Sequence, residues 1–121
     1  MPDMDAVPDP LTPELRDELQ ELTDGLCKVL NDPKRLMLLY ALGEGPRSVS
    51  ALAAMLGAPQ TNVSQHLALF RERGLVDTER RGASIIYSLR YPELIGAVDQ
   101  LRAVLRREAG RGGLDPRAET G

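Results

Sequence analysis

The stretch from residue 47 to residue 76 limits the fold more than any other part of this chain. Two short segments, residues 50–56 and 60–73, carry apolar residues at helical spacing, and residues 57–59 between them read Gly-Ala-Pro. A glycine and a proline can turn the chain, but a helix does not continue through them. The pattern therefore predicts two helices joined by a tight turn, which is the arrangement of a helix-turn-helix.

The second of these segments has one apolar face and one polar face. Val63, Leu67 and Phe70 stand at i, i+4 and i+7, which predicts that they are buried together. Small and uncharged polar side chains on the other face fit a DNA major groove about 12 Å wide and can bond to base edges. We therefore predict a recognition helix at residues 60–73, the alternative being ordinary polar surface. Its expected DNA contacts are Gln60, Thr61, Asn62, Ser64 and Gln65.

Between residues 75 and 89 the apolar period changes from helical to two, with residues 81–84 as a turn. This predicts a β-hairpin, and residues 78–88 are expected to form a wing that touches DNA. An exposed guanidinium at its tip can lie along a phosphate or enter a minor groove. Each candidate arginine is equally well explained as a solvated charge. The candidate phosphate contacts are Arg71, Arg73, Arg80 and Arg81.

Three segments resemble one known family in the family's own order. The ArsR/SmtB-type winged-helix repressors have a recognition helix similar to VSQHLALFRERGLV (63–76) and a wing similar to TERRGASIIYSL (78–89). Their second helix resembles LNDPKRLMLLYAL (30–42). The resemblance implies a homodimeric transcriptional repressor that reads an inverted-repeat operator in double-stranded DNA and is released by an unidentified signal.

The first and last predicted helices each carry an apolar stripe. The first begins after Thr12, a good N-cap, with Pro13 at its first position, and the last runs from Pro92 to about Ala109, capped by Gly110. Such stripes pack on their own domain or on a partner helix. The resemblance favours the partner, and we expect a homodimer about a two-fold axis. The predicted interface residues are Leu15, Leu19, Leu22, Leu26, Leu94, Val98, Leu101 and Leu105.

Capping residues predict the remaining helix starts. Asp32 is expected to cap a helix over residues 33–42. A short strand at residues 47–49 is followed by Ser50 as the cap of the next helix. Pro59 fits the first position of the recognition helix, which leaves that helix without a good side-chain cap. The residues expected in the core of the second helix are Leu36, Leu39 and Tyr40, with Met37 beside them.

These elements predict a mainly α fold with a β-hairpin wing (α+β), a winged helix-turn-helix. Five helices are expected, with a strand before the third and the hairpin before the fifth. The 121 residues suffice for one domain, over residues 12–110. A disordered acidic arm (1–11) and a disordered tail (111–121) are expected to flank it.

The net charge of −3 conceals a segregation along the chain. Residues 1–33 carry nine acidic and two basic side chains, whereas residues 34–90 carry eight basic and four acidic ones. A basic middle fits DNA binding, and the acidic start keeps non-specific binding weak. The longest apolar run, residues 36–42, is far shorter than the ~20 residues that span a bilayer. We therefore expect no membrane association and a cytoplasmic location.

The single histidine and single cysteine argue against a metal centre. Tight transition-metal sites use about four N or S ligands, and a dimer would offer only two copies each of His66 and Cys27. The paired-cysteine motif of metal-sensing relatives is absent from residues 48–53. We predict no cofactor, no metal site and a structural role for His66. For Cys27 a buried inert thiol is preferred over a metal effector or a redox role.

No catalytic motif stands out in the sequence. A glycine-rich phosphate loop, a nucleophile elbow and a catalytic Cys–His spacing are all absent. We therefore predict that the protein is not an enzyme. The alternative to a repressor is a winged-helix module for protein–protein interaction without sequence-specific DNA binding.

Overall fold

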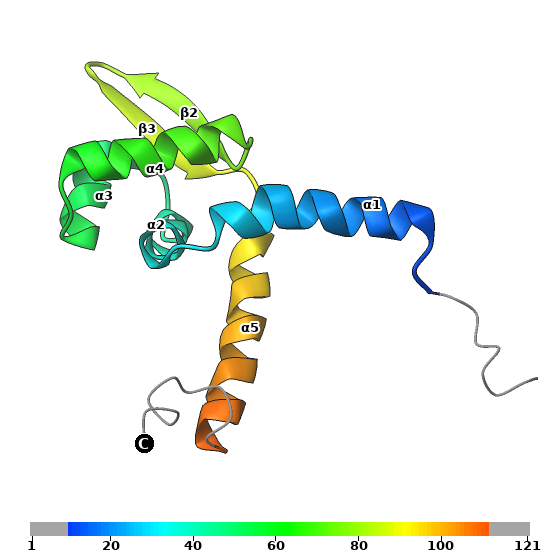
Figure 1. Cartoon of the computed structure of the whole chain (residues 1–121). Helices are drawn as coiled ribbons and strands as arrows, with labels where there is room; N and C mark the ends of the chain where they lie inside the picture. The colour runs from blue at the N-terminus through cyan, green and yellow to red at the C-terminus, as the bar shows by residue number, and fades with distance from the viewer. Residues whose placement is uncertain (1–9, 112–121) are drawn as a thin grey trace, which may run out of the picture.

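The computed structural model describes residues 10–111, and its elements follow the order of a winged helix-turn-helix (Figure 1). In chain order they are α1 (Pro13–Leu22), the π-helical turn η1 (Thr23–Cys27), α2 (Pro33–Gly43), β1 (Arg47–Ser48), α3 (Val49–Leu56), α4 (Gln60–Glu72), β2 (Val76–Arg81), β3 (Ser84–Leu89) and α5 (Glu93–Gly110). The predicted fold class is confirmed. Disorder is predicted for residues 1–11 and 111–121. Almost all of these residues lie outside the part of the chain that the structure describes.

The first helix begins as its sequence predicts. The Thr12 hydroxyl accepts a hydrogen bond from a backbone N–H of the first turn at 3.1 Å, and Pro13 is the first helical residue. The helix then widens into η1, which contains Gly25, and continues to Val29. Neither apolar periodicity nor capping residues predicted this π-helical turn.

The second helix begins at its predicted cap but buries a different face. The Asp32 carboxylate accepts two backbone N–H groups at 2.8 and 3.2 Å. Leu39 is buried as expected, whereas Leu36 and Tyr40 are half-buried and Met37 is 54 % exposed. The core prediction is thus wrong in part, because the most buried face of α2 is turned toward α3 and β3. That face carries Leu38, Leu39, Ala41 and Leu42.

Two helix starts in the helix-turn-helix differ by one or two residues from the prediction. Ser48, not Ser50, caps α3, and its Oγ accepts a backbone N–H at 3.2 Å. Ser48 ends β1 and has the extended backbone that an N-cap needs, whereas Ser50 is already helical. Gly57, with φ +62°, ends α3. Pro59 is the N-cap of α4 rather than its first residue, and the predicted lack of a side-chain cap is confirmed.

The three strands form an antiparallel sheet in the order β1-β3-β2. β1 pairs with β3 through Arg47 opposite Tyr87, and the β2–β3 hairpin closes at Arg81 opposite Ser84. Gly82 takes φ +61° in the two-residue connection, so the turn is shorter than the four residues predicted. The hairpin itself is confirmed.

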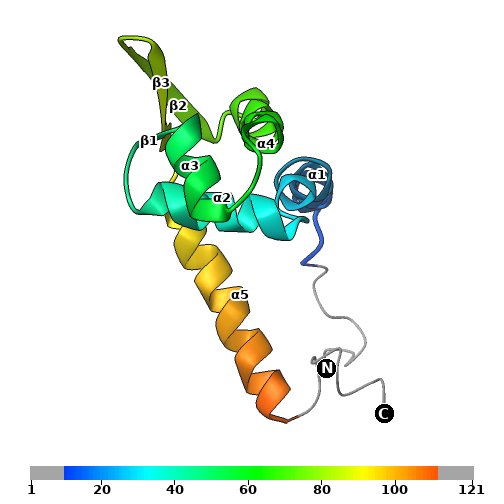
Figure 2. The same cartoon turned by 90° about the vertical axis from the view of Figure 1, so that its left-hand side faces the viewer.

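The hydrophobic core lies in a central body made of α2, α3, α4 and the base of the sheet. Its fully buried side chains are Leu38, Leu39, Leu52, Val63, Leu67 and Phe70, and Val29 packs into the same core from the helical segment after η1. α1 and α5 leave this body in different directions (Figures 1 and 2). Within residues 10–111, α1 buries no residue and α5 buries only Val98. No described helix is long and apolar enough to cross a bilayer.

Candidate nucleic-acid interface

Burial fixes which face of α4 points outward. Val63, Leu67 and Phe70 have no exposed surface, so the helix cannot rotate about its axis without unpacking the core. The opposite face is therefore presented to solvent in one orientation. The five residues predicted to contact DNA from α4 are all exposed: Gln60, Thr61, Asn62, Ser64 and Gln65.

The end of α4 is tied to the base of the hairpin. Gly74 takes φ +71°, and the Leu75 N–H donates to the Phe70 carbonyl at 2.9 Å before β2 begins. Across the hairpin, Arg90 donates to Asp77 at 2.7 and 3.0 Å. These hydrogen bonds to the Asp77 carboxylate raise the pKa of the Arg90 guanidinium. Helix and wing are thus held in a fixed relation.

A groove of about 380 Å³ separates the starts of α3 and α4 from the hairpin. Figure 2 shows the hairpin rising beside these helices. The groove brings Gln60 and Ser64 of α4 opposite residues of the wing. Its polar lining consists of Ser48, Ser50, Gln60, Ser64, Ser84 and Tyr87. Hydroxyl and amide groups of this kind donate hydrogen bonds to phosphate oxygens.

Besides Ser48, three polar groove residues were missed by sequence reasoning. Ser50 was interpreted as a helix cap and Ser84 as part of a turn, while Tyr87 was treated only as a member of the apolar alternation. Each local interpretation accounted for the residue, and no local signal places these side chains in one groove. Only the pairing of β1 with β3, between strands distant in sequence, brings them together.

The four candidate arginines are exposed but lie in different places. Arg80 and Arg81 end β2 at the tip of the hairpin, where Arg81 pairs with Glu79 at 3.3 Å. Both side chains of this ion pair are about two-thirds exposed, so the pair is weak. Arg81 can therefore exchange Glu79 for a DNA phosphate. Arg71 and Arg73 lie at the other end of α4. Arg73 points toward η1, since its guanidinium lies 3.9 Å from where a Cβ on Gly25 would stand.

His66 and Cys27 lie on different elements, α4 and η1. His66 is half-buried in α4. It contributes slightly to the lowered pKa of Asp32, which is due mainly to the backbone N–H of Arg35. Within residues 10–111, no group of three or more His, Cys, Asp or Glu side chains is placed to hold a metal ion. Cys27 is exposed, so the expectation of a buried thiol is wrong for the protomer. It lines a shallow cavity that also includes Leu101.

The predicted dimer residues divide into two groups in the protomer. Val98 is buried, and Leu26 and Leu94 pack against the central core, so these three already have contacts in their own chain. The others are exposed or half-buried: Leu15, Leu19, Leu22, Leu101 and Leu105. Among the residues that the structure describes, Leu101, at 69 %, is the most exposed large apolar side chain.

Comparison with known proteins identifies relatives over most of the chain. The family described as bacterial regulatory protein, arsR family, matches residues 32–78, which run from the cap of α2 into β2. Over 79 residues the chain is 39 % identical to the biofilm growth-associated repressor of Agrobacterium fabrum. That alignment covers 65 % of this chain and 68 % of the relative.

Solved structures extend the likeness to the whole fold. The crystal structure of NolR from Sinorhizobium fredii matches with a TM-score of 0.67 and 33 % identity, covering 79 % of this chain and 95 % of NolR. A solution structure of the homodimeric winged helix-turn-helix DNA-binding domain of Mb0332 from Mycobacterium bovis matches with a TM-score of 0.61 and 27 % identity. It covers 86 % of this chain and 94 % of that domain. This chain therefore belongs to the arsR family of bacterial regulatory proteins.

Proposed function

We propose that this protein is a homodimeric transcriptional repressor that binds an inverted-repeat operator in the cytoplasm, where bacterial DNA lies. The observation that carries the proposal is the fixed, exposed and uncharged polar face of α4 beside a hydroxyl-lined groove and a basic wing tip. A two-fold dimer would place two copies of α4 in successive major grooves, about 34–36 Å apart.

The exposed residues then take different roles. Gln65 and Ser64, with Gln60 and Thr61, read base edges, and a glutamine can bridge N6 and N7 of adenine. Asn62 bonds to a phosphate near the open start of α4. Phosphate contacts fix the register without reading sequence. They are assigned to Arg71, Arg73, Arg80 and Arg81 and to the groove hydroxyls of Ser50, Ser84 and Tyr87.

The relatives support this proposal by their names. The Agrobacterium fabrum relative is called a repressor, and the Mb0332 domain is called homodimeric and DNA-binding. We propose that the protein acts by binding rather than by catalysis, without a resident metal or cofactor. Its effector is not identified by any metal-ligating cluster within residues 10–111.

A fluorescence-anisotropy titration tests the proposal directly. The protein is titrated against a duplex from its own promoter and against a scrambled duplex of equal length. We expect preference for the promoter, and Gln65→Ala should reduce that preference by about 5- to 150-fold because a bidentate base contact is lost. Gln100→Ala, an exposed glutamine on α5, is the matched control and should leave the preference unchanged.

The same titration separates the alternatives. Wild-type protein with no preference for the promoter would overturn the repressor proposal and favour a protein-interaction module. Repeating it with alkylated Cys27 and with Zn²⁺ or Ni²⁺ tests the effector. We expect the preference to survive both metals, because the described residues offer no ligand cluster.

A further inference from the structure

An open cavity of about 320 Å³ lies between α2 and α3, away from the groove beside the wing. Its size falls in the range of small-molecule sites, which are mostly apolar with a few polar groups. The lining comes from α2, its C-cap and α3, and not from the end helices α1 and α5. We call it the α2–α3 cavity, and its lining residues are Met37, Tyr40, Ala41, Glu44, Met55 and Leu56.

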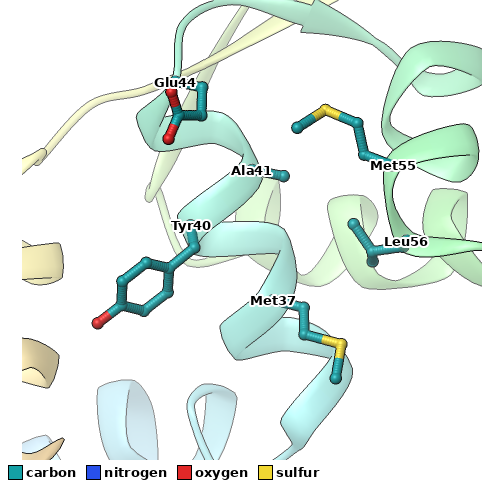
Figure 3. Close-up of a pocket in the computed structure, with 6 residues that line it drawn as sticks. All are labelled: Met37, Tyr40, Ala41, Glu44, Met55 and Leu56. Carbon is teal, nitrogen blue, oxygen red and sulfur yellow. The ribbon is translucent and has the colours of Figure 1, made fainter.

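Two exposed methionines give the α2–α3 cavity its apolar character. Met37 on α2 and Met55 on α3 are 54 % and 48 % exposed, although methionine is usually buried. Figure 3 shows both side chains on the Ala41 side of α2, whereas the Tyr40 ring points the other way. Methionine is unbranched and polarisable, so such a pair adapts to apolar groups of varied shape. The cavity therefore suits the apolar body of a small molecule.

Glu44 is the one charged residue among the six that line the cavity. It is the C-cap of α2, where the helix dipole is negative and favours a cation. The last turn of α2 has no basic side chain, and within residues 10–111 the Glu44 carboxylate makes no ion pair. Arg102 lies over the Tyr40 ring, but its charge is paired with Asp99 at 3.0 Å. This end of the cavity is therefore negative and attracts a positively charged group.

The cavity adjoins the part of α3 that leads into the recognition helix. Met55 and Leu56 end α3, and Gly57, with φ +62°, begins the short turn to α4. α3 is a main neighbour of α4, and the start of α4 has no side-chain cap to hold it in place. A molecule wedged between α2 and α3 would therefore shift the start of α4, with Gln60, relative to the wing.

We propose that the α2–α3 cavity binds a small organic cation, an ammonium group on an apolar body, and that this binding releases the operator. The apolar body lies against Met37 and Met55, and the ammonium group pairs with Glu44. The inference rests on the proposed repressor and names the chemical class of its effector. By linkage, the cation and the operator each lower the affinity of the protein for the other.

Binding is tested with three probes that differ only in their head group. Phenylpropylammonium, phenylpropanol and phenylbutanoate share one apolar body and are positive, neutral and negative at neutral pH. Isotope-labelled methionine methyl groups are followed by NMR, with Met37→Leu and Met55→Leu to assign the two cavity signals. Phenylpropylammonium should shift both signals saturably, in the millimolar range that suits so small a ligand. The alcohol should bind about fivefold more weakly, and the carboxylate more weakly still.

Removal of the Glu44 charge tests where the ammonium group lies. Glu44→Gln should weaken phenylpropylammonium about fivefold and abolish its advantage over the alcohol, because the ion pair is lost. Glu72→Gln is the matched control, since Glu72 also stands at the end of a helix but does not line the cavity, and it should bind as wild type does. Equal binding of the three probes, unchanged binding by Glu44→Gln, or no saturable shift in wild type would overturn the inference.

Release of DNA is tested by anisotropy titration of the promoter duplex with and without phenylpropylammonium. An equal concentration of NaCl replaces the cation in the control, because DNA binding depends on salt. At saturation the cation should lower the operator affinity about fivefold or more. Shifted methionine signals without this loss would overturn the effector role. If wild type prefers its promoter when no cation is present, only the inference has failed, whereas a wild type without that preference would refute the proposed function.

Discussion

The central body and the two end helices use the same kind of apolar stripe in different ways. In α4, the stripe of Val63, Leu67 and Phe70 is fully buried in the core of the same chain, where α3 and β2 are the main neighbours of α4. In α5, the stripe begins at half-buried Leu94 and buried Val98 but continues to Leu101 and Leu105, which are 69 % and 47 % exposed. Within one chain, the apolar stripe of α4 is thus fully packed, whereas the apolar stripe of α5 stays partly exposed.

This difference separates two sources of stability. Burial within one chain stabilises the central body at any protein concentration, whereas burial between chains stabilises the ends only by mass action. The orientation of α4 and the wing is therefore set before association. Association sets the spacing between two copies of α4, which an inverted-repeat operator requires.

The largest effect is expected from a cavity in the central body. Phe70→Ala should lower the free energy of unfolding by about 3–5 kcal/mol, because it removes a fully buried ring among tightly packed neighbours. Urea denaturation at two protein concentrations measures the loss, which should be the same at both. Leu105→Ala, at a half-exposed position on α5, is the control and should cost much less under monomeric conditions. A loss that vanished at high concentration would contradict the division into two regions.

The next largest effect is expected on the affinity of the dimer, from a substitution on α5. Leu101→Ser should weaken the dimer about tenfold or more, since burial of a leucine contributes about 1.5–3 kcal/mol, and should leave monomer stability nearly unchanged. Sedimentation equilibrium measures the first quantity and dilute urea denaturation the second. Gln100→Ser, next to it on α5, is expected to alter neither. If Leu101→Ser unfolded the protomer, the exposed stripe would belong to the intrachain core after all.

Sequence reasoning succeeded where the signal was local. Thr12 and Asp32 cap their helices, and the period change after residue 75 marks the hairpin. In α2, however, residues 36–42 are apolar on every side, so periodicity did not decide that Leu38 is buried and Met37 exposed. The positions of α3 and β3 in the folded chain decide which of these side chains is buried.

In the candidate DNA interface, too, local patterns predict one part, and long-range strand pairing determines the rest. The exposed face of α4 follows from the helical phase of its buried residues. Ser48 and Ser50 both suit a helix cap, and the strand pairing at β1 selects between them. The groove joins Ser50 to Ser84 through that same long-range pairing, which no local pattern specifies.

A smaller effect is expected at the wing. Arg81→Ala should weaken binding to promoter and scrambled DNA about equally and reduce the salt slope by about 1 per protomer, because one phosphate contact is lost. Anisotropy titrations at salt concentrations between about 50 and 200 mM measure this salt dependence of the DNA affinity. Arg111→Ala, at the end of α5, is the charge-matched control. Equal slopes for Arg81→Ala and wild type would remove the wing from the DNA interface.

The smallest effect concerns the polar link between the two regions. The Tyr40 hydroxyl on α2 donates to Asp99 on α5 at 2.5 Å, and Arg102 donates to the same carboxylate at 3.0 Å. The hydrogen bond from Tyr40 is the main reason that the pKa of Asp99 is lowered. Burial, followed by the bond to Asp99, raises the pKa of Tyr40. The Arg102 and Asp99 side chains are about half exposed, so their ion pair contributes little stability.

The sign of the pH dependence follows from these shifts. A carboxyl whose pKa is lowered by folding stabilises the fold above its unfolded pKa of about 4 and loses that contribution as pH falls. Asp99→Asn should therefore melt slightly below wild type at pH 7, and the difference should disappear as the pH falls below about 4. A raised phenol pKa acts at the other end, where stability is lost above about pH 10. A difference in melting temperature between wild type and Asp99→Asn that stayed constant from pH 7 to pH 3 would have another cause. It would show that the asparagine amide makes poorer contacts than the carboxyl, whatever the charge. The link would then carry no charge-dependent coupling between α5 and the central body.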